Sequence, residues 1–238
     1  MDKLSHLKTA AIEKATHLDF FNIAISVDCV LFGYEDKQLK VLLIKSDLKE
    51  FEGMWSLLGD LVKPNEDIED APYRVLEERT GFQDVYLQQV QTFGNVNRHP
   101  SGRVITTAYF SLVNIRNHWV DLKKNELHWH GVNNIKQMAF DHKLILHTCI
   151  DLLRDQIMEQ SLVFNLLPEK FSLRELQDIY EAILGTELDR RNFRKRIMLK
   201  EWLVDLNEME EDVPHRPGKL YKFRSTKVVA DRKKLISV

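Results

Sequence analysis

Charged residues between Leu57 and Phe82, in the stretch LLGDLVKPNEDIEDAPYRVLEERTGF, have types and spacings that could do chemistry. We expect a helix over about residues 68 to 79, which places positions 75, 78 and 79 on one face because they lie three and four residues apart. Carboxylates gathered on such a face could hold a divalent cation that activates water. Only Glu78 is acidic there, since position 75 is Val and position 79 is Arg, a fixed positive charge. This face therefore lacks the set of anionic oxygens that a divalent cation needs.

The same stretch resembles the Nudix box, which reads glycine, five residues, glutamate, seven residues and then R-E-U-x-E-E-x-G-U, where U is aliphatic. The matching positions are Glu66, Arg74, Glu78, Gly81 and Phe82. The departures are Asp60 at the first glycine, Val75 at the glutamate of R-E, and Arg79 at the last glutamate. An ordinary acidic helix followed by a turn is the simpler interpretation, but it leaves the register from residue 57 to residue 82 unexplained.

In that family the box forms a loop, a helix and a loop that point carboxylates at Mg²⁺ ions bridging a diphosphate. Because two of the three helix carboxylates are absent here, the resemblance implies a pocket that binds a ligand without hydrolysing it. We predict no catalytic residue, no bound metal and no cofactor. The resemblance and the local periodicity imply an α/β fold, a Nudix-like α/β/α sandwich with a mixed sheet. Strands are predicted at 21–34, 40–46, 55–62, 85–96, 103–115 and 126–131, with an amphipathic helix at 140–158.

Polar residues near the box are candidates for lining the pocket, because a polar side chain on an apolar strand is unfavourable unless it is satisfied. The predicted effector-binding residues are Asp28, Lys45, Trp55, Glu66, Arg74, Glu78 and Arg98. His128 and His130 have H-x-H spacing, but no third ligand stands at metal spacing, so alternation along a strand explains them better.

A second module follows a linker at residues 159–170, in which VFNLLP is apolar enough to dock on a domain. Ser172 and Glu175 have capping-box spacing, and Gly185 ends that helix. Asp189 caps a second helix whose outer face offers cations and an amide to a DNA major groove. A basic turn between two short strands in HRPGKLYKF, after an acidic loop, completes a small winged helix-turn-helix domain. The predicted DNA-binding residues are Arg190, Arg191, Asn192, Arg194, Lys195, Arg216 and Lys219.

The distribution of charge supports this division. The net charge is -2, but residues 190–238 hold 14 Lys and Arg against 7 Asp and Glu, whereas the rest of the chain holds 20 against 29. A basic end on an acidic protein indicates nucleic-acid binding. At 238 residues the chain suits a medium domain plus a small one. We predict a leader helix at 1–19, a Nudix-like effector-binding domain at 20–158, the linker, and a winged helix domain at 171–238.

The sequence favours a cytoplasmic protein. No apolar run approaches the ~20 residues of a membrane span, and the N-terminal residues lack the apolar region of a signal peptide. Cys29 and Cys149 lie in apolar surroundings, where they could form a disulfide, but buried reduced thiols fit better.

A Nudix-like domain followed by FSLRELQDIYEAILGTELDRRNFRKR and HRPGKLYKF resembles the Nudix-related transcriptional regulators over nearly the whole chain. Those families include repressors of NAD biosynthesis genes that respond to ADP-ribose, and sugar-responsive relatives such as the arabinose regulator of Bacteroidetes. The R-V-L-x-E-x-T-G form of the box and FNLLP before the winged helix resemble the sugar-responsive branch more closely.

The predicted function is ligand-responsive control of transcription. A homodimer would place two winged helices on a two-fold-related double-stranded DNA operator, while a sugar such as L-arabinose, or an ADP-ribose-like effector, occupies the old active site. Two other classes remain open. A Mg²⁺-dependent hydrolase of a nucleoside diphosphate derivative would use Glu66, Glu77 and Glu78 as an atypical metal site, with the winged helix as an accessory. A protein-interaction module would show a DNA affinity that is indifferent to salt.

Overall fold

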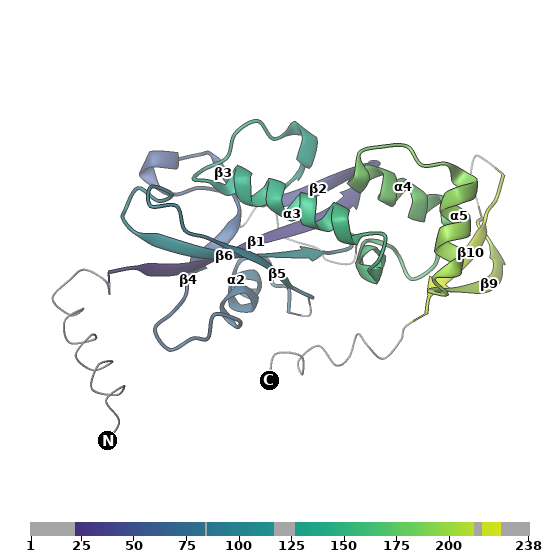
Figure 1. Ribbon diagram of the computed structural model, residues 1–238, viewed down its shortest axis with the longest axis horizontal. Helices are drawn as coiled ribbons and strands as arrows, with labels where there is room; N and C mark the ends of the chain where they lie inside the picture. The colour runs from purple at the N-terminus through teal and green to yellow at the C-terminus, as the bar shows by residue number, and fades with distance from the viewer. Residues whose placement is uncertain (1–21, 84, 117–126, 212–215, 225–238) are drawn as a thin grey trace, which may run out of the picture.

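The computed structural model describes residues 22–83, 85–116, 127–211 and 216–224. Figure 1 shows a sheet with helices on both faces, followed by a smaller helical unit that ends in a β-hairpin. The predicted leader helix at residues 1–19 and the end of the predicted winged helix domain, residues 225–238, lie outside the described residues. In the described ranges, no helix is long and apolar enough to cross a membrane.

A mixed sheet forms the first unit, as predicted, and it has seven strands in the described residues. Its order is β3-β2-β1-β6-β5, with β4 paired to β1 and β7 paired to β2. β1 and β6 run parallel, whereas the other pairs are antiparallel. The strands are β1 (Ala24–Glu35), β2 (Gln38–Lys45), β3 (Trp55–Ser56), β4 (Leu58–Leu61), β5 (Gln88–Phe93), β6 (Val104–Leu112) and β7 (Leu127–Gly131).

Helices cover both faces of the sheet because alternating residues of β1 point to opposite sides. Leu31 packs into an apolar cluster with α2 (Ala71–Thr80), whereas Phe32 packs into a second cluster with α3 (His142–Gln156). This arrangement is the predicted α/β/α sandwich. The α2 helix begins later than predicted because Pro72 lacks a backbone N–H and fits only in the first turn.

Most strand predictions are confirmed to within a few residues, with two differences. The strand predicted at 21–34 begins at Ala24, and Ile23 and Ile25 are 38% and 46% exposed. The strand predicted at 55–62 is divided into β3 and β4, which pair with different neighbours. Short 3-10 helices, η2 (Lys49–Phe51) and η3 (Val132–Asn134), follow β2 and β7.

The predicted linker docks on the protein, as its apolar sequence indicated. It contains a 3-10 helix, η4 (Ser161–Leu166), in which four residues are buried: Leu162, Val163, Phe164 and Leu166. The Phe164 ring stacks on Phe223 of the second unit, with 4.3 Å between ring centroids. One apolar cluster runs from α3 through η4 into helix α4 (Leu173–Leu184) of the second unit. The two units therefore share a close-packed core, which makes their connection stiff.

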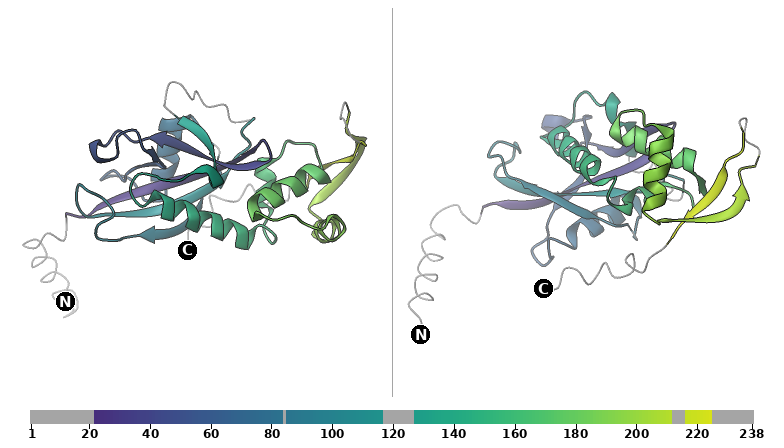
Figure 2. Two further views of the ribbon diagram at one scale, coloured as in Figure 1. Left: turned by 90° about the horizontal axis from the view of Figure 1, so that it is seen from above. Right: turned by 45° about the vertical axis from the view of Figure 1, so that its right-hand side comes forward.

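The second unit is built as the capping signals predicted. Its elements are β8 (Phe171–Ser172), α4 (Leu173–Leu184), α5 (Arg190–Leu199), β9 (Leu203–Met209) and β10 (Lys219–Phe223). The Ser172 N–H donates to the Glu175 carboxylate at 2.8 Å, and the Glu175 N–H donates to the Ser172 hydroxyl at 3.3 Å. Gly185 ends α4 with a φ of 71°, and Asp189 caps α5. Figure 2 shows the β9–β10 hairpin extending beyond α4 and α5 as a wing.

The wing differs from its prediction in one strand. β9 occupies residues 203–209, where an acidic loop was expected, and pairs with β10 in a three-stranded sheet of order β8-β10-β9. Arg216 precedes β10 and Lys219 is its first residue, so HRPGKLYKF contributes one strand instead of two. Leu203 is buried and anchors β9, while the acidic side chains of that strand are exposed. Their charge concealed the strand in the sequence.

Both cysteines are free and buried, as the sequence favoured. Burial raises the pKa of the Cys149 thiol to about 12, and it also raises the pKa of Cys29. Both groups are therefore protonated, unreactive members of the core at neutral pH.

Gly59 lies opposite Asp28 in the β1–β4 pairing, and a Cβ there would be 2.4 Å from Oδ1 of Asp28 and 2.8 Å from the Val27 carbonyl oxygen. We expect Gly59→Ala to lower the free energy of unfolding by about 1–3 kcal/mol, the usual effect of overpacking, as measured by urea denaturation. Gly94→Ala is the matched control, because the nearest atom to its Cβ would be 3.7 Å away. Equal effects of the two substitutions would contradict the close approach at Gly59.

Candidate functional site

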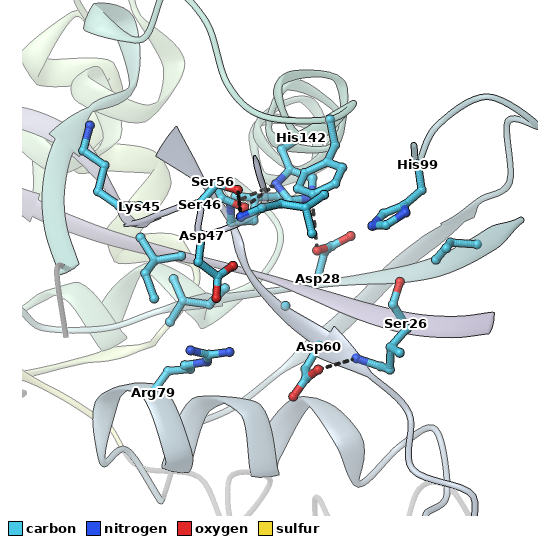
Figure 3. A pocket seen from close by; sticks show the side chains of 18 of the residues that line it. Ser26, Asp28, Lys45, Ser46, Asp47, Ser56, Asp60, Arg79, His99 and His142 are labelled. Atoms are coloured by element: carbon cyan, nitrogen blue, oxygen red, sulfur yellow. Dashed lines mark hydrogen bonds and ion pairs between the residues drawn. The ribbon is translucent and has the colours of Figure 1, made fainter. Parts of the chain in front are cut away.

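A cavity of about 320 Å³ opens between the last turn of α2 and the start of α3 (Figure 3). Residues of β1, β2, β4 and the turn between β5 and β6 form its walls. Its charged and polar lining consists of Ser26, Asp28, Lys45, Ser46, Asp47, Ser56, Asp60, Arg79, Arg98, His99 and His142. Three of the predicted effector residues, Asp28, Lys45 and Arg98, therefore meet at one cavity.

Asp28 is a buried carboxylate, 4% exposed, held by two partners. Its Oδ2 lies 3.4 Å from Nη2 of Arg98, and its Oδ1 lies 3.4 Å from Nε2 of His142. A buried carboxylate needs such partners because burial by itself disfavours the charged form. The absence of a side chain at Gly59 leaves the space that the carboxylate fills. Residues from three segments that are distant in the sequence therefore hold the Asp28 carboxylate in place.

Arg98 joins the turn of the β5–β6 hairpin to the start of α3. Its Nε and Nη2 donate to Oδ2 and Oδ1 of Asp141 at 3.0 and 2.8 Å. This two-pronged geometry is the strong form of an arginine–carboxylate pair. The structure also buries Arg98, so the side chain is a fixed part of the cavity wall and not a solvated turn residue.

His142 is a neutral histidine that accepts hydrogen bonds through Nδ1. The Leu57 N–H donates to Nδ1 at 3.0 Å, and an amide can only donate, so the ring proton is on Nε2 and faces Asp28. Burial lowers the pKa of His142, which favours the same neutral form. The Ser56 hydroxyl also lies 3.0 Å from Nδ1. Because the Leu57 amide shares that lone pair, Nδ1 is a poor general base for Ser56.

The matching residues of the box form an ion-pair cluster of their own. Arg74 donates to Glu66 through Nε at 2.6 Å and Nη2 at 2.9 Å, and to Glu78 through Nη1 at 3.2 Å. Lys63 adds a backbone N–H to Glu66 at 3.0 Å and its ammonium to Glu78 at 3.3 Å. The hydrogen bond from Arg74 is the main reason that the pKa of Glu66 falls to about 2. The structure does not bring Glu66, Arg74 or Glu78 to the wall of the cavity.

The donors present do not fit a divalent cation beside α2, which needs several anionic oxygens. Val75 is 1% exposed and packs in the apolar cluster beneath the helix. Glu78 is bound by two cations, and Arg79 lines the cavity with a positive charge. Across the residues described, no group of three or more His, Cys, Asp or Glu side chains could hold a metal ion.

Lys45 and Trp55 stack at the edge of the sheet. The Lys45 ammonium lies 3.8 Å from the centroid of the Trp55 ring and donates to the Gly53 carbonyl at 2.6 Å. Trp55 also contacts the rings of His130 and His128, at 4.2 and 5.2 Å between centroids. The H-x-H pair therefore belongs to aromatic packing on this edge. Trp55 does not line the cavity, so only Lys45 of this predicted pair reaches it.

The sequence did not single out His142, Ser56 or Asp141, which complete the network around Asp28. His142 falls in the first turn of the predicted helix and Ser56 on a predicted strand, but neither position signals its proximity to residue 28. Phe140 was missed as well, although its ring stacks on His99 at 5.1 Å and 15° and gives the cavity an aromatic wall.

α5 presents a positively charged outer face. Phe193 and Ile197, on its inner face, are buried in the core. The predicted DNA-binding residues of this helix are all exposed: Arg190, Arg191, Asn192, Arg194 and Lys195. An exposed, arginine-rich face on the second helix of a helix-turn-helix is suited to phosphate and base contacts in a major groove.

A groove between α4, α5 and the wing gathers five cations. They are Arg174, Arg190, Arg194, Arg216 and Lys219. Arg174 was not predicted to bind DNA, because the capping box already explained the sequence of the first turn of α4. Lys219 lies 2.8 Å from Asp205, an exposed pair that can be exchanged for a phosphate at little cost. Arg191 and Lys195 lie on α5 outside this groove.

Comparison with known proteins identifies both units. The NUDIX domain family matches residues 23–149, and the NrtR DNA-binding winged helix domain matches residues 163–223. The ADPR responsive transcriptional repressor NtrR of Acinetobacter baylyi is 31% identical over 210 residues, which cover 86% of this chain and 84% of that protein. An ADP-ribose pyrophosphatase of Methanocaldococcus jannaschii is 28% identical over 127 residues, 53% of this chain and 73% of that protein.

Solved structures extend the similarity across both units. Shewanella oneidensis NrtR complexed with a 27mer DNA has a TM-score of 0.76 and 30% identity, covering 84% of this chain and 93% of that chain. The Nudix domain of the same protein complexed with ADP ribose has a TM-score of 0.50 and 27% identity, covering 64% of this chain and 99% of that chain. These relatives confirm the predicted Nudix-related regulator but not its placement in the sugar-responsive branch. The chain belongs to the NrtR family of transcriptional regulators, in which a Nudix domain precedes a winged helix DNA-binding domain.

Proposed function

We propose that this protein is a transcriptional repressor that binds operator DNA through α5 and the wing and leaves it when ADP-ribose fills the cavity beside α2. The observation that carries the proposal is a single apolar core that joins a cation-rich winged helix to a Nudix cavity. The acidic residues of the Nudix box, Glu66 and Glu78, are bound by Arg74. Two relatives support the choice of ligands. One is named for its response to ADPR, and the other forms complexes with DNA and with ADP ribose.

On the DNA side, the exposed face of α5 enters a major groove. Arg190, Arg191, Arg194 and Lys195 supply phosphate and base contacts, and Asn192 hydrogen-bonds an adenine. The cationic groove beside the wing follows the DNA backbone. Two copies related by a two-fold axis place their α5 helices on half-sites about 34 Å apart, or a multiple of that spacing.

ADP-ribose carries a diphosphate, two riboses and an adenine, so its site must offer cations, hydroxyl partners and an aromatic surface. The cavity offers Arg79 as a cation directed into it and Lys45 as a second cation turned away from its centre, Asp28 as an acceptor, and the stacked rings of Phe140 and His99. Its volume of about 320 Å³ is typical of small-molecule sites. A pentose would use the hydroxyl partners and leave the cations unmatched, which favours ADP-ribose as the effector.

α3 connects the cavity to the winged helix. Its first residue, His142, belongs to the network around Asp28. Just beyond its last turn, the Ile157 carbonyl accepts a hydrogen bond from the Tyr180 hydroxyl of α4 at 3.2 Å. Glu159 forms an ion pair with Lys200 at the end of α5. An effector that displaces the start of α3 therefore shifts α4 and α5. To release DNA, it must bind the DNA-incompetent arrangement more tightly, by ~1–3 kcal/mol for ordinary coupling.

A hydrolase is the second candidate, favoured by the similarity to the ADP-ribose pyrophosphatase of Methanocaldococcus jannaschii. The three acids that it would need point to other partners: Glu66 and Glu78 share Arg74, and Glu77 accepts from the Gln83 amide at 2.8 Å. The repressor therefore retains its effector and does not consume it. Mg²⁺-dependent release of AMP from ADP-ribose, lost in Glu78→Gln, would instead support the hydrolase.

Arg191→Ala is expected to weaken binding to the DNA upstream of the protein's own gene by about 5-fold or more, because a good arginine contact contributes ~1–3 kcal/mol. Fluorescence anisotropy of the full-length protein at two salt concentrations measures the affinity and its salt dependence. Lys143→Ala, which removes an exposed cation from α3, is the matched control. An affinity unchanged within about twofold would exclude α5 as the recognition helix, and salt-independent affinity would favour the protein-interaction module.

ADP-ribose is expected to lower the DNA affinity of the wild-type protein by about 5-fold to 150-fold, the range of ordinary allosteric coupling. The same anisotropy assay, titrated with ADP-ribose, L-arabinose and other pentoses, measures this factor for each ligand. Release by a pentose, with no response to ADP-ribose, would show that the effector belongs to the sugar class and that the proposal names the wrong ligand.

Tyr180→Phe removes the hydrogen bond between α4 and the end of α3. Loss of this bond is expected to reduce severalfold the factor by which ADP-ribose weakens DNA binding. Each ligand alone should keep its affinity within about threefold, and the free energy of unfolding should fall by about 1–2 kcal/mol. Tyr73→Phe on α2 is the control. A coupling factor equal to that of the wild type would exclude this route between the sites.

A further inference from the structure

The diphosphate of the effector poses a problem of charge, which rests on the proposed function. In the Nudix family the box directs carboxylates at Mg²⁺ ions that bridge a diphosphate, but the donors beside α2 do not fit such an ion. A diphosphate buried in a protein needs positive partners, because an unpaired buried charge is strongly unfavourable. The cavity must therefore supply a cation of its own.

Arg79 is placed to be that cation. It is the one residue of α2 on the cavity wall, and Figure 3 shows its guanidinium pointing from the helix into the cavity, towards Asp47. The other positions on this helix face supply no charge there. Val75 is buried in the core, and Glu78 is bound by two cations outside the cavity.

The other basic groups of the cavity are less well placed to meet a phosphate. Arg98 is bound by Asp141 and Asp28. The Lys45 ammonium donates to a backbone carbonyl at 2.6 Å, and Figure 3 shows it turned away from the centre of the cavity. Burial is the main cause that lowers the pKa of His99, so its ring is neutral near pH 7. Arg79 is therefore the group best placed for the phosphates.

We propose that Arg79 binds the diphosphate of the effector directly and takes the place of the divalent cation that Nudix hydrolases use. A guanidinium is always charged, and its planar set of donors matches two phosphate oxygens at once. Arginine at the last glutamate position of the box reverses the sign of the charge, so the site attracts phosphate and repels a metal ion. ADP-ribose then binds without metal, and no metal-bound water is present to attack it.

Asp47 adds a second consequence. Figure 3 places its carboxylate across from the Arg79 guanidinium, so its negative charge faces the position that a bound phosphate would take. Removing that negative charge should favour the effector. Asp47→Asn is therefore expected to tighten ADP-ribose binding by severalfold, the opposite of the effect of an Arg79 substitution.

Isothermal titration calorimetry of the full-length protein with ADP-ribose, in EDTA and in excess Mg²⁺, tests the proposal. We expect wild-type dissociation constants in the two buffers to agree within about twofold. Arg79→Ala should weaken binding by about 10-fold or more, since charge-assisted hydrogen bonds to phosphate are lost. Arg79→Lys keeps the charge but loses the planar set of donors, so its dissociation constant should lie between those of the wild type and Arg79→Ala. Arg116→Ala, on an exposed residue after β6, is the matched control.

The outcomes separate this inference from the proposed function. If the wild-type protein binds ADP-ribose only with Mg²⁺, or if Arg79→Ala binds as tightly as the wild type, Arg79 does not replace the metal, although the effector assignment stands. If the wild-type protein binds no ADP-ribose in either buffer, the proposed effector is wrong as well. Circular dichroism of each variant establishes that the fold is retained, as expected for an exposed residue.

Discussion

The buried carboxylate of Asp28 is the constraint on which the cavity depends. A charge in the interior is tolerated only when its oxygens are partnered. Arg98 must therefore reach inwards from its turn, His142 must hold its proton on Nε2, and Gly59 must lack a side chain. These requirements draw together β1, β4, the β5–β6 hairpin and the first turn of α3. One side of the cavity is thereby rigid, while the opposite side, formed by Arg79 and the loop after β2, remains polar and exposed to a ligand.

A continuous apolar core limits how the winged helix can respond to this cavity. The segment between the two units is not a tether, because its residues are buried between α3 and α4. Two bodies joined in this way cannot swing apart without exposing the core, so movement has to consist of small shifts of packed helices. α3 is suited to transmit such a shift, since its first turn contacts Asp28 and its end contacts Tyr180. Under the proposed function, close packing would turn a local displacement at the cavity into a change in the orientation of α5.

Local signals allowed much of the fold to be predicted from the sequence. The Ser172–Glu175 capping box, Asp189 before α5 and the register of the Nudix box all depend on residues near one another in the chain. Pairs that only the fold creates, such as Asp28 with His142, could not be predicted from residues so far apart in the chain. Nor did the sequence reveal β9, in which buried Leu203 shares a strand with the acidic Asp205 and Glu208. Glu66 and Glu78 were expected at the pocket because of their positions in the Nudix box. The sequence does not reveal that Arg74 binds both of them away from the cavity wall.

A regulatory site that binds its ligand without hydrolysing it is consistent with the energetics of ligand binding. An enzyme that hydrolyses its ligand directs binding energy to the transition state, and its occupancy reflects turnover as well as concentration. A site that neutralises the diphosphate with Arg79 activates no water, so occupancy follows the concentration of the effector alone. Micromolar binding corresponds to ~8 kcal/mol, and a coupling of ~1–3 kcal/mol needs only a fraction of it. That fraction can be supplied by a small difference in how the start of α3 meets the ligand in the two arrangements. A pocket that has lost its metal chemistry can therefore still control DNA binding.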